Sequence, residues 1–468
     1  MRLALLLFVC LGSYVHANCV ASLLYFQDCH EIVPVPHKND TWGGIARLAT
    51  VLQAHNSTHT DIVFGGDLAG GTLFGALYKG VPFVNVFNQL GVTLANFGQH
   101  DFDFGYHHTL DLYQLSDFPW ISSNLIHAST HAPFVNTTHI LRRHGEIRLG
   151  YIGLTTNMNS TVSTGLLEEP IVRASRRAIQ ALGDVDAVVA VTQLNNASAW
   201  ELMTALPSIH VLLREEDNAA SLGSVDEVAP GRYIVSPRGD YGTVTEVSFK
   251  KEQGCLKTWI DVHKVDSSVR QDPAFLPLQT QLERSFNETL SQRVGTAADP
   301  FSVAEAGALV TDAYRHESGA QLAWQGYGGI RSSIPPGAIT LRSLYSVLPF
   351  GDALGVINVT GADVRDALQR TLDDMTDETE LPFVSGMNFA YTQHTSTYDL
   401  VNITLPNGHA MDPSAHYSLV LPNFHVADTF AHPKFIAKNV TTDVMALIHA
   451  VQAWHTVQPA PRRAHLVS

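Results

Sequence analysis

The size, composition and charge of the chain exclude several classes of protein. Its 468 residues exceed the length at which a single hydrophobic core stops growing, so two large domains are expected. Hydrophobic residues at 45% and charged residues at 16% exclude an intrinsically disordered chain. A formal net charge of −15 excludes a chain-wide basic surface, so no nucleic acid polymer is expected as a partner, whereas a small anion bound at one local cluster remains compatible.

The N-terminus has the pattern of a secretory signal. Arg2 precedes the apolar run Leu3 to Leu11, and Val15-His16-Ala17 forms a small-residue cleavage site, which predicts a signal peptide over residues 1–17. The run is too short to span a bilayer, and no later apolar stretch approaches about 18 residues. The end of the chain, residues 459–468, is polar and basic. We therefore expect a secreted protein without a membrane anchor.

Two further features agree with a secretory route. Nine Asn-x-Ser/Thr sequons predict a glycoprotein: Asn39, Asn56, Asn136, Asn159, Asn196, Asn287, Asn358, Asn402 and Asn439. Of the four cysteines, Cys10 leaves with the signal, and the remaining three can form one bridge at most, so packing must supply the stability. Cys29, between Asp28 and His30, is either a small buried hydrophobe at a strand end, the reading we favour, or a metal ligand.

Short apolar runs alternate with helical patterns over the first half of the chain. This alternation predicts an α/β layered domain over residues 20–265. The expected helices are Gly43 to His55 and Arg173 to Leu182. The expected buried strands are Ser22 to Phe26, Asp61 to Phe64, Val92 to Ala95, Arg148 to Leu154, Ala187 to Val191 and His210 to Leu213.

A connector and a second unit follow. The polar, amphipathic stretch Asp272 to Val294 predicts a linker helix within residues 266–294. The second unit is expected over residues 295–457, with helices at Val303 to His316 and Gly361 to Met375. Its expected strands are Leu354 to Val359, Val401 to Leu405 and Ser418 to Leu421.

Polar motifs follow the predicted strands of the first unit, at the strand ends where α/β folds place their chemistry. Asp28-Cys29-His30 puts two ligand side chains on one side of a sheet, and Asp67 of Gly66-Asp67 can bridge two cations. The others are the run Gly98 to Asp103, Thr192-Gln193, and Glu215 to Asn218. Each motif alone is weak, because a Gly-Asp pair after a strand is usually a turn and a lone His is usually structural.

In this order and spacing the motifs resemble the calcineurin-like metallophosphoesterases, and specifically the 5′-nucleotidase family. Further support comes from Gly43 to Arg47, Gly71-Thr72, Gly105 and Asp117 to Asn124. The resemblance covers nearly the whole mature chain. It implies an N-terminal four-layer αββα metallophosphoesterase sandwich, joined by a helix to a C-terminal α/β substrate domain.

The resemblance also implies a site for two divalent cations. Asp28, His30 and Asp67 match family metal ligands, with Asp67 as the bridge, and His100 held by Asp103 matches the dyad that supports the transition state. Three other positions differ from the family: Gln99 replaces Asn, Gln193 replaces His, and Glu215 to Asn218 replaces Gly-His-x-His. Gln99, Gln193, Glu216 and Asn218 would thus form a weakened or altered second metal site. Their oxygen atoms favour Mg²⁺, Ca²⁺ or Mn²⁺ over Zn²⁺, and the metal identity stays open among the four.

The second unit contains the motifs that would hold the substrate. Trp324 to Arg331 is a glycine-rich turn that resembles the family motif bringing Arg331 to the phosphate, with Gly326 where the family usually has Asn. Phe350 and Phe424 match the two faces of a clamp around a nucleobase, and Asp428 matches a ribose-binding position. A single Phe is more often a core residue, and it is the motif context that reverses this reading.

These features predict a secreted, metal-dependent phosphomonoesterase, a hydrolase acting on nucleoside 5′-monophosphates or related phosphate esters. Its partner is then a small nucleotide or phosphate ester. The alternative is a catalytically impaired nucleotide-binding homologue that has lost part of its second metal site. A third option is an interaction protein that keeps only the fold.

Overall fold

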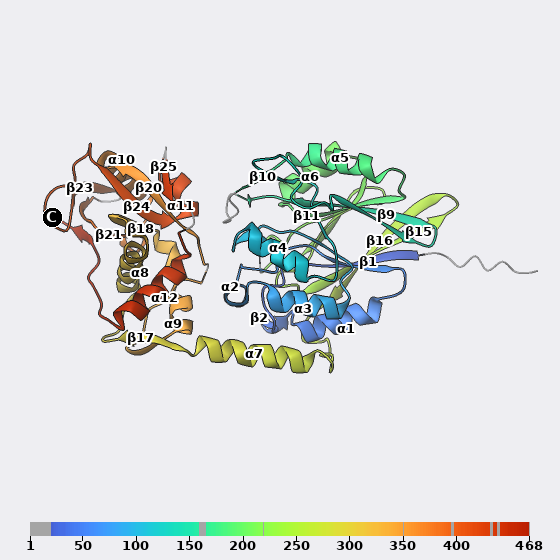
Figure 1. The fold of residues 1–468 in the computed structure, drawn as a ribbon, viewed down its shortest axis with the longest axis horizontal. Coiled ribbons are helices and arrows are strands. Elements are labelled where there is room, and N and C mark those ends of the chain that lie inside the picture. The colour runs from blue at the N-terminus through green and yellow to red at the C-terminus, as the bar shows by residue number, and fades with distance from the viewer. Residues whose placement is uncertain are drawn as a thin grey trace, which may run out of the picture.

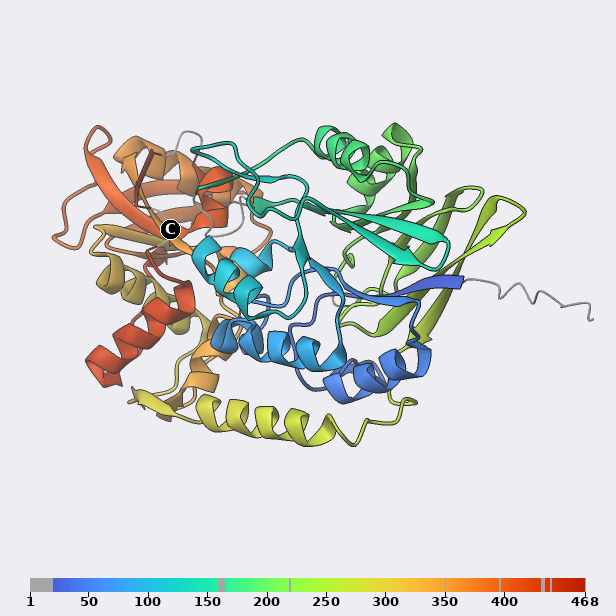
Figure 2. The same ribbon diagram turned by 45° about the vertical axis from the view of Figure 1, so that its right-hand side comes forward.

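The computed structural model describes residues 20–158, 165–218, 220–349, 351–394, 397–430, 434–437 and 440–467. The predicted signal peptide at 1–17, the sequons at Asn159 and Asn439, and Phe350 lie outside these residues. Figure 1 shows two separate layered units, with the helix α7 (Leu276–Leu290) running beneath the region between them. Figure 2 shows the same helix, in yellow, below both units.

Two six-stranded sheets form the centre of the first unit. The first sheet has the order β16 (Cys255–Lys264), β15 (Thr243–Glu252), β1 (Val20–Phe26), β4 (Thr60–Phe64), β5 (Leu94–Asn96), β6 (Trp120–Ile121). The second has the order β13 (Ser224–Ala229), β14 (Arg232–Ser236), β12 (Ile209–Leu213), β11 (Ala187–Gln193), β9 (Ile147–Thr155), β8 (His139–His144).

The two sheets face each other across a core of alternate side chains. Leu23, Tyr25 and Val63 of the first sheet join Val189 and Val211 of the second in one buried cluster. Helices cover both outer faces, with α5 and α6 above the sheets and α1 and α3 below them in Figure 1. The first sheet carries α1 (Ile45–His55), α3 (Val81–Leu90) and α4 (Tyr106–Leu115), and the second carries α5 (Ile171–Leu182) and α6 (Asn196–Ala205). The predicted αββα sandwich is therefore confirmed.

Two short two-stranded sheets flank the sandwich: β2 (Val35–His37) with β3 (Asp40–Trp42), and β7 (Leu125–His127) with β10 (Leu166–Glu168). The expected strands and helices of the first unit all coincide with observed elements, although the strand expected from Val92 begins two residues later, at Leu94. The long β15–β16 hairpin was not predicted from the sequence, because its outer strand β16 is mostly exposed and lacks an apolar run.

The second unit contains a five-stranded and two three-stranded sheets. Their orders are β21 (Phe383–Ser385), β18 (Leu322–Gln325), β24 (His416–Pro422), β20 (Leu354–Thr360), β25 (Lys434–Ala437); β19 (Gly337–Thr340), β17 (Arg293–Ala297), β26 (Thr456–Val457); and β23 (Tyr398–Thr404), β22 (Asn388–Gln393), β27 (Ala464–Leu466). The helices are α8 (Val303–Ser318), α9 (Leu341–Val347), α10 (Gly361–Asp374), α11 (Asn423–Thr429) and α12 (Asp443–Trp454).

Helix α8 illustrates how local sequence sets these elements. Ser302 and Glu305 form a capping box that satisfies the first backbone N–H groups of the helix. Gly319 ends it in the left-handed conformation at φ 68°, which glycine adopts without a Cβ clash. The helix then packs against α12 and β18 in the core of the second unit.

Helix α2 (Leu73–Tyr78) connects the two units. Its residues Leu73, Ala76 and Leu77 pack against the core of the second unit. On α7, the Phe286 ring packs edge-to-face against Phe74 of α2 with ring centroids 5.3 Å apart. These apolar contacts place the loop before α2, which carries residues of the site, beside the second unit.

Candidate active site

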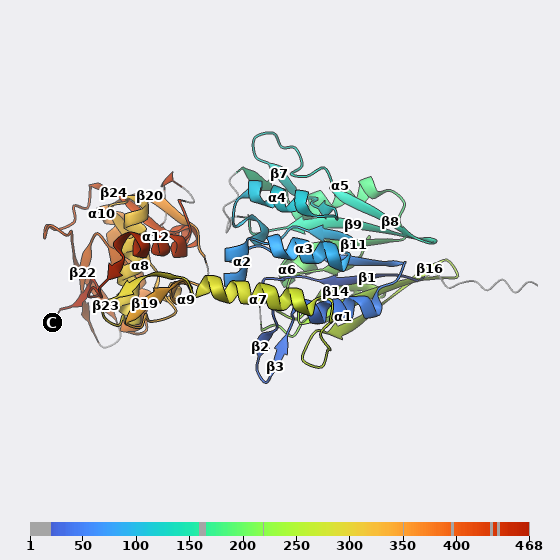
Figure 3. The same ribbon diagram turned by 60° about the horizontal axis from the view of Figure 1, so that its bottom comes forward.

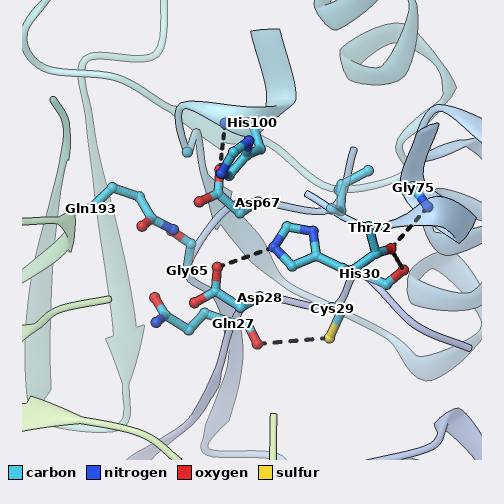
Figure 4. Close-up of polar contacts among 12 residues, drawn as sticks. Gln27, Asp28, Cys29, His30, Gly65, Asp67, Thr72, Gly75, His100 and Gln193 are labelled. Atoms are coloured by element: carbon cyan, nitrogen blue, oxygen red, sulfur yellow. Dashed lines mark hydrogen bonds and ion pairs between the residues drawn. The ribbon is translucent and has the colours of Figure 1, made fainter. Parts of the chain in front are cut away.

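Three predicted ligands lie together at one edge of the first sheet (Figure 4). Asp28 and His30 follow β1, and Asp67 follows the parallel neighbour β4. His30 Nε2 lies 3.5 Å from Asp28 Oδ1. Each of the three residues offers one ligand atom, and these atoms all lie within 4.8 Å of one another. Two carboxylates and an imidazole are a donor set suited to a divalent cation.

The backbone at both carboxylates is unusual. Asp28 has φ 52° and Asp67 has φ 63°, in the left-handed region that residues other than glycine seldom adopt. The Asp28 N–H donates to the Gly66 carbonyl at 3.2 Å, so the two strand ends hold each other. Such conformations persist where the surrounding structure imposes them, and they concentrate at functional sites.

Two glycines let the loops approach this cluster closely. A Cβ at Gly98 would lie 2.0 Å from Asp67 Oδ1. A Cβ at Gly71, where φ is 72°, would lie 2.7 Å from the His30 ring. Any larger residue at these positions would displace a predicted ligand.

His100 and Asp103 form the predicted dyad, at the 3-10 turn His100–Phe102. His100 Nδ1 lies 2.8 Å from Asp103 Oδ2, and the His100 backbone N–H donates to Asp67 Oδ1 at 2.8 Å. Burial lowers the pKa of His100, but the hydrogen bond to Asp103 and the charge of Asp67 outweigh it and raise this pKa to about 10. The dyad therefore places an imidazolium beside the carboxylates.

Several buried polar atoms around the carboxylates have no hydrogen-bond partner in the described part of the chain. They are Asp28 Oδ2, His30 Nδ1, Gln99 Oε1, Gln193 Oε1 and Glu216 Oε2. Buried polar atoms are nearly always satisfied, so each exception needs an explanation. Oxygen and imidazole nitrogen atoms left free together fit bound divalent cations.

The charges of the site also favour bound divalent cations. Burial, followed by the charge of Asp28, raises the pKa of Glu215 to about 7 and that of Glu216 to about 10. Burial also raises the pKa of Asp28 to about 7. Carboxylates are this reluctant to ionise because they are desolvated next to one another. A divalent cation between them would supply the missing positive charge.

The substituted positions divide into two groups. Gln193, at the end of β11, is fully buried and donates through Nε2 to the Gly65 carbonyl at 3.4 Å. The Gln99 side chain lies close enough to Glu215 to lower the pKa of its carboxyl, and the Glu216 backbone N–H lowers the pKa of Asp28 in the same way. Asn218 lies apart, exposed to solvent, with its amide oxygen accepting from the Ala220 N–H at 2.9 Å within its own turn.

Three carboxylates of the cluster were missed from the sequence. Glu215 stands beside Gln99, and Asp240 lies close enough to raise the pKa of Glu216. Asp101 is fully buried and accepts from the backbone N–H groups of Asp67, Leu68, Ala69 and Gly98, at 2.8 to 3.3 Å. The motif Gly98 to Asp103 contains Asp101, but the sequence does not show that the Asp101 side chain points inward. Only the structure identifies it as the residue that supports both its own loop and the loop after β4.

Cys29 takes the structural role that we favoured. Its side chain is fully buried in the cluster that contains Phe26 and Ile32. Burial raises the pKa of its thiol well above the usual value, which disfavours the thiolate that metals bind.

The predicted substrate-binding residues of the second unit are placed less completely. Arg331 is exposed, and its Nη1 donates to the Gly328 carbonyl at 3.3 Å. Phe424 and Asp428 lie on α11 (Asn423–Thr429). Phe350 falls outside the described residues, between Pro349 and Gly351.

A cavity of about 360 Å³ lies between the two units next to the dyad. The first unit contributes Gly70, Gly71, Lys79, Asp103 and Phe104, and the second contributes Tyr345, Gly351, Ala353, Thr441, Thr442 and Met445, among others. Asp352 lies beside this boundary, where burial and the charge of Asp103 raise its pKa to about 6. The cavity is thus open to a small molecule that touches both units.

Comparisons with known proteins agree with this architecture. The model of the 5′-nucleotidase C-terminal domain matches residues 286–433. A snake venom 5′-nucleotidase of Naja atra is 27% identical over 409 residues, which cover 75% of this chain and 77% of that protein. The 5′-nucleotidase of Rattus norvegicus is 24% identical over 413 residues, covering 77% and 71%.

The fold is shared with solved structures as well. The crystal structure of a 5′-nucleotidase precursor from Thermus thermophilus aligns with a TM-score of 0.64 at 20% identity, over 96% of this chain and 99% of that chain. The relatives are hydrolases that act on phosphate ester bonds. Residues 286–433 thus match the 5′-nucleotidase C-terminal domain, and the chain as a whole is similar in sequence and fold to 5′-nucleotidases.

Proposed function

We propose that the chain is a secreted phosphomonoesterase that hydrolyses nucleoside 5′-monophosphates or related phosphate esters with the help of divalent cations. The observation that carries this proposal is the set of unsatisfied buried atoms at Asp28, His30, Gln99, Gln193 and Glu216, which lie around Asp67 and next to a charged His–Asp dyad. The snake venom relatives support export from the cell. None of the helices in the described part of the chain has the length and apolar character that a bilayer crossing requires.

Each residue has a defined task in this proposal. Asp28, His30 and Asp67 would hold a first cation, while Asp67, Gln99, Gln193 and Glu216 would hold a second. Bound cations supply Lewis-acid stabilisation of phosphate oxygens. Glu215 and Asp101 position Gln99 and Asp67 respectively. Asn218 is left out of the proposed ligand set because of its exposed position.

The dyad would act on the phosphoryl group itself. Asp103 orients the His100 ring, and its hydrogen bond to the ring favours the protonated imidazole by raising the His100 pKa. A charged donor at this place stabilises negative charge on phosphate oxygens as the ester bond breaks. The cavity between the units would hold the rest of the substrate, with Arg331, Phe350, Phe424 and Asp428 contributing from the second unit.

The direct test is phosphate release from AMP by the purified chain, measured with Mg²⁺, Mn²⁺, Ca²⁺ or Zn²⁺ after treatment with a chelator. We expect activity that returns on adding a divalent cation. AMP binding without phosphate release under any of the four cations would instead identify the nucleotide-binding homologue.

Restoring imidazole at the second site should strengthen metal binding. In Gln193→His/Glu216→His, imidazole replaces the oxygen donors of a buried and a half-buried residue, and imidazole is the stronger ligand for first-row metals. We expect Zn²⁺ and Mn²⁺ to bind about 10-fold more tightly, a partial gain because outer-shell partners alone alter affinity by about 10- to 100-fold. Calorimetry and AMP hydrolysis would be measured together.

The matched control for this variant is Gln180→His, which adds an imidazole on the exposed face of α5. A restored variant that binds metal no better than this control would exclude Gln193 and Glu216 as ligands. Tighter binding with slower hydrolysis would mean that the oxygen donors are a functional adaptation to hard cations.

The two predicted base-stacking rings can be tested by comparing substrates. Phe350→Ala and Phe424→Ala should each weaken AMP binding by roughly 5- to 150-fold, since stacking of a base on an aromatic ring contributes about 1–3 kcal/mol. A simple phosphate ester without a base should lose little. KM values for both substrates give the answer, and equal losses would assign the rings to packing.

A further inference from the structure

A second group of metal-ligand residues lies in the first unit, apart from the residues of the candidate active site. His55, Glu246 and His263 each offer one ligand atom, and these atoms lie within 4.8 Å of one another. His55 is the last residue of α1, Glu246 lies on β15 and His263 on β16. None of them belongs to the motifs of the candidate active site.

The fold brings the three residues together from distant parts of the chain. In the β15–β16 hairpin Glu246 pairs with Asp261 and Val244 pairs with His263, so Glu246 and His263 are diagonal neighbours on one face. Helix α1 packs against β15, and its C-terminal end delivers His55 to the same place. Figure 3 shows α1 and β16 in the same region of the unit.

Both imidazoles converge on a single carboxylate oxygen. His55 Nδ1 lies 3.3 Å and His263 Nε2 lies 2.9 Å from Glu246 Oε2, and the two rings stack with centroids 3.6 Å apart. The His55, Glu246 and His263 side chains are 35%, 20% and 21% exposed, so a cation could reach them from solvent.

The distances suit a tetrahedral metal ion. With metal–ligand distances of about 2.0–2.2 Å, the ligand atoms of a tetrahedral site lie about 3.3–3.5 Å apart. The 3.3 Å separation of His55 Nδ1 from Glu246 Oε2 meets this geometry, and the 2.9 Å separation of His263 Nε2 from the same oxygen is a few tenths of an ångström short of it. Two nitrogen donors and one carboxylate favour Zn²⁺ over the oxygen-seeking cations Mg²⁺ and Ca²⁺.

We infer that His55, Glu246 and His263 form a zinc site that fastens the end of α1 to the β15–β16 hairpin. Water completes the coordination at the exposed fourth position. The site serves stability, because it joins a helix end to the outer hairpin of the first sheet. It does not depend on the proposed phosphoesterase activity.

Cobalt(II) is a suitable probe, since its visible absorption reports tetrahedral coordination. The parent protein would be Asp28→Asn/Asp67→Asn, in which two of the proposed carboxylate ligands of the candidate active site are removed. We expect this parent to bind one Co²⁺ with tetrahedral absorption, and the added change His263→Gln to weaken that binding at least about 10-fold, the lower range for loss of even an outer-shell partner. Zn²⁺ should raise the unfolding temperature of the parent but not of the His263→Gln protein.

Two further variants make the result specific. Glu246→Gln keeps an oxygen that can accept hydrogen bonds from the imidazoles, so this variant should fold normally in the presence of a chelator. Because it loses the anionic ligand, it should bind Co²⁺ more weakly than the parent does. His449→Gln is the matched control, because His449 pairs with Glu317 at 3.1 Å in an ordinary ion pair, with no second His in the pair. If His263→Gln and Glu246→Gln bind Co²⁺ as well as His449→Gln does, the three residues are an ion-pair cluster and the inference is wrong.

Discussion

Asp67→Asn is expected to reduce metal-dependent phosphate release by at least about 10²- to 10³-fold, the loss typical of removing a single group that stabilises the transition state. Asp67 is 1% exposed, and burial raises the pKa of its carboxyl well above the usual value, so its charge is costly unless a cation balances it. A neutral amide cannot compensate two cations. Phosphate release from AMP over a range of metal concentrations measures the effect.

The variant should still fold, because an Asn oxygen can accept the hydrogen bond that the His100 N–H donates to Asp67 Oδ1. Asp61→Asn provides the control: Asp61 is a buried carboxylate at the opposite end of the same strand β4, hydrogen-bonded to His144 and Tyr151. Asp61→Asn should leave the metal dependence unchanged. If Asp67→Asn releases phosphate from AMP as fast as the natural chain does, Asp67 is not a ligand shared by two cations.

Asp101→Asn should have the largest effect on stability among substitutions near the site. Each carboxylate oxygen accepts two backbone N–H groups: Oδ1 those of Leu68 and Ala69, and Oδ2 those of Asp67 and Gly98. An Asn would place its own N–H₂ against one of these pairs of donors. Hydrogen bonds to a charged group contribute about 1.5–3 kcal/mol each, so the loss of two is large.

Part of this loss is offset, since burial raises the pKa of Asp101 despite the four hydrogen bonds, and the neutral variant avoids that desolvation cost. We expect the free energy of unfolding to fall by about 2–4 kcal/mol. Urea unfolding of the metal-free protein measures it, with Asp111→Asn on the exposed side of α4 as the control. If Asp101→Asn and Asp111→Asn unfold alike, the loops do not depend on Asp101.

The sequence alone determined the layered α/β architecture and the residues nearest to the strand ends. Buried strands such as β9 and β11 are mainly apolar, and α5 has a clear polar and apolar face, so local patterns identify them. Asp28 and Asp67 follow β1 and β4 directly, and parallel neighbours necessarily end at the same edge of a sheet. The motif resemblance then related these residues to known chemistry.

The tertiary structure alone decided which loop residues turn inward. Asn218 and Glu216 are two residues apart, yet Glu216 is half-buried near Asp28 while Asn218 is exposed in a turn. Asp101 became part of the site through hydrogen bonds to the loop after β4, and Glu215 through its place beside Asp28 and Gln99. Loop side chains have no period, so the direction of each depends on the elements packed around it.

The same reason applies to the second group of ligands. His55 is separated from Glu246 and His263 by about two hundred residues of chain, and neither β15 nor β16 carries a motif that relates them. Their meeting depends on the register of the hairpin and on the position where α1 ends above the sheet. Sequence patterns reflect the local backbone conformation. Contacts between residues this far apart in the sequence depend on how the elements pack, so only the folded chain brings these three side chains together.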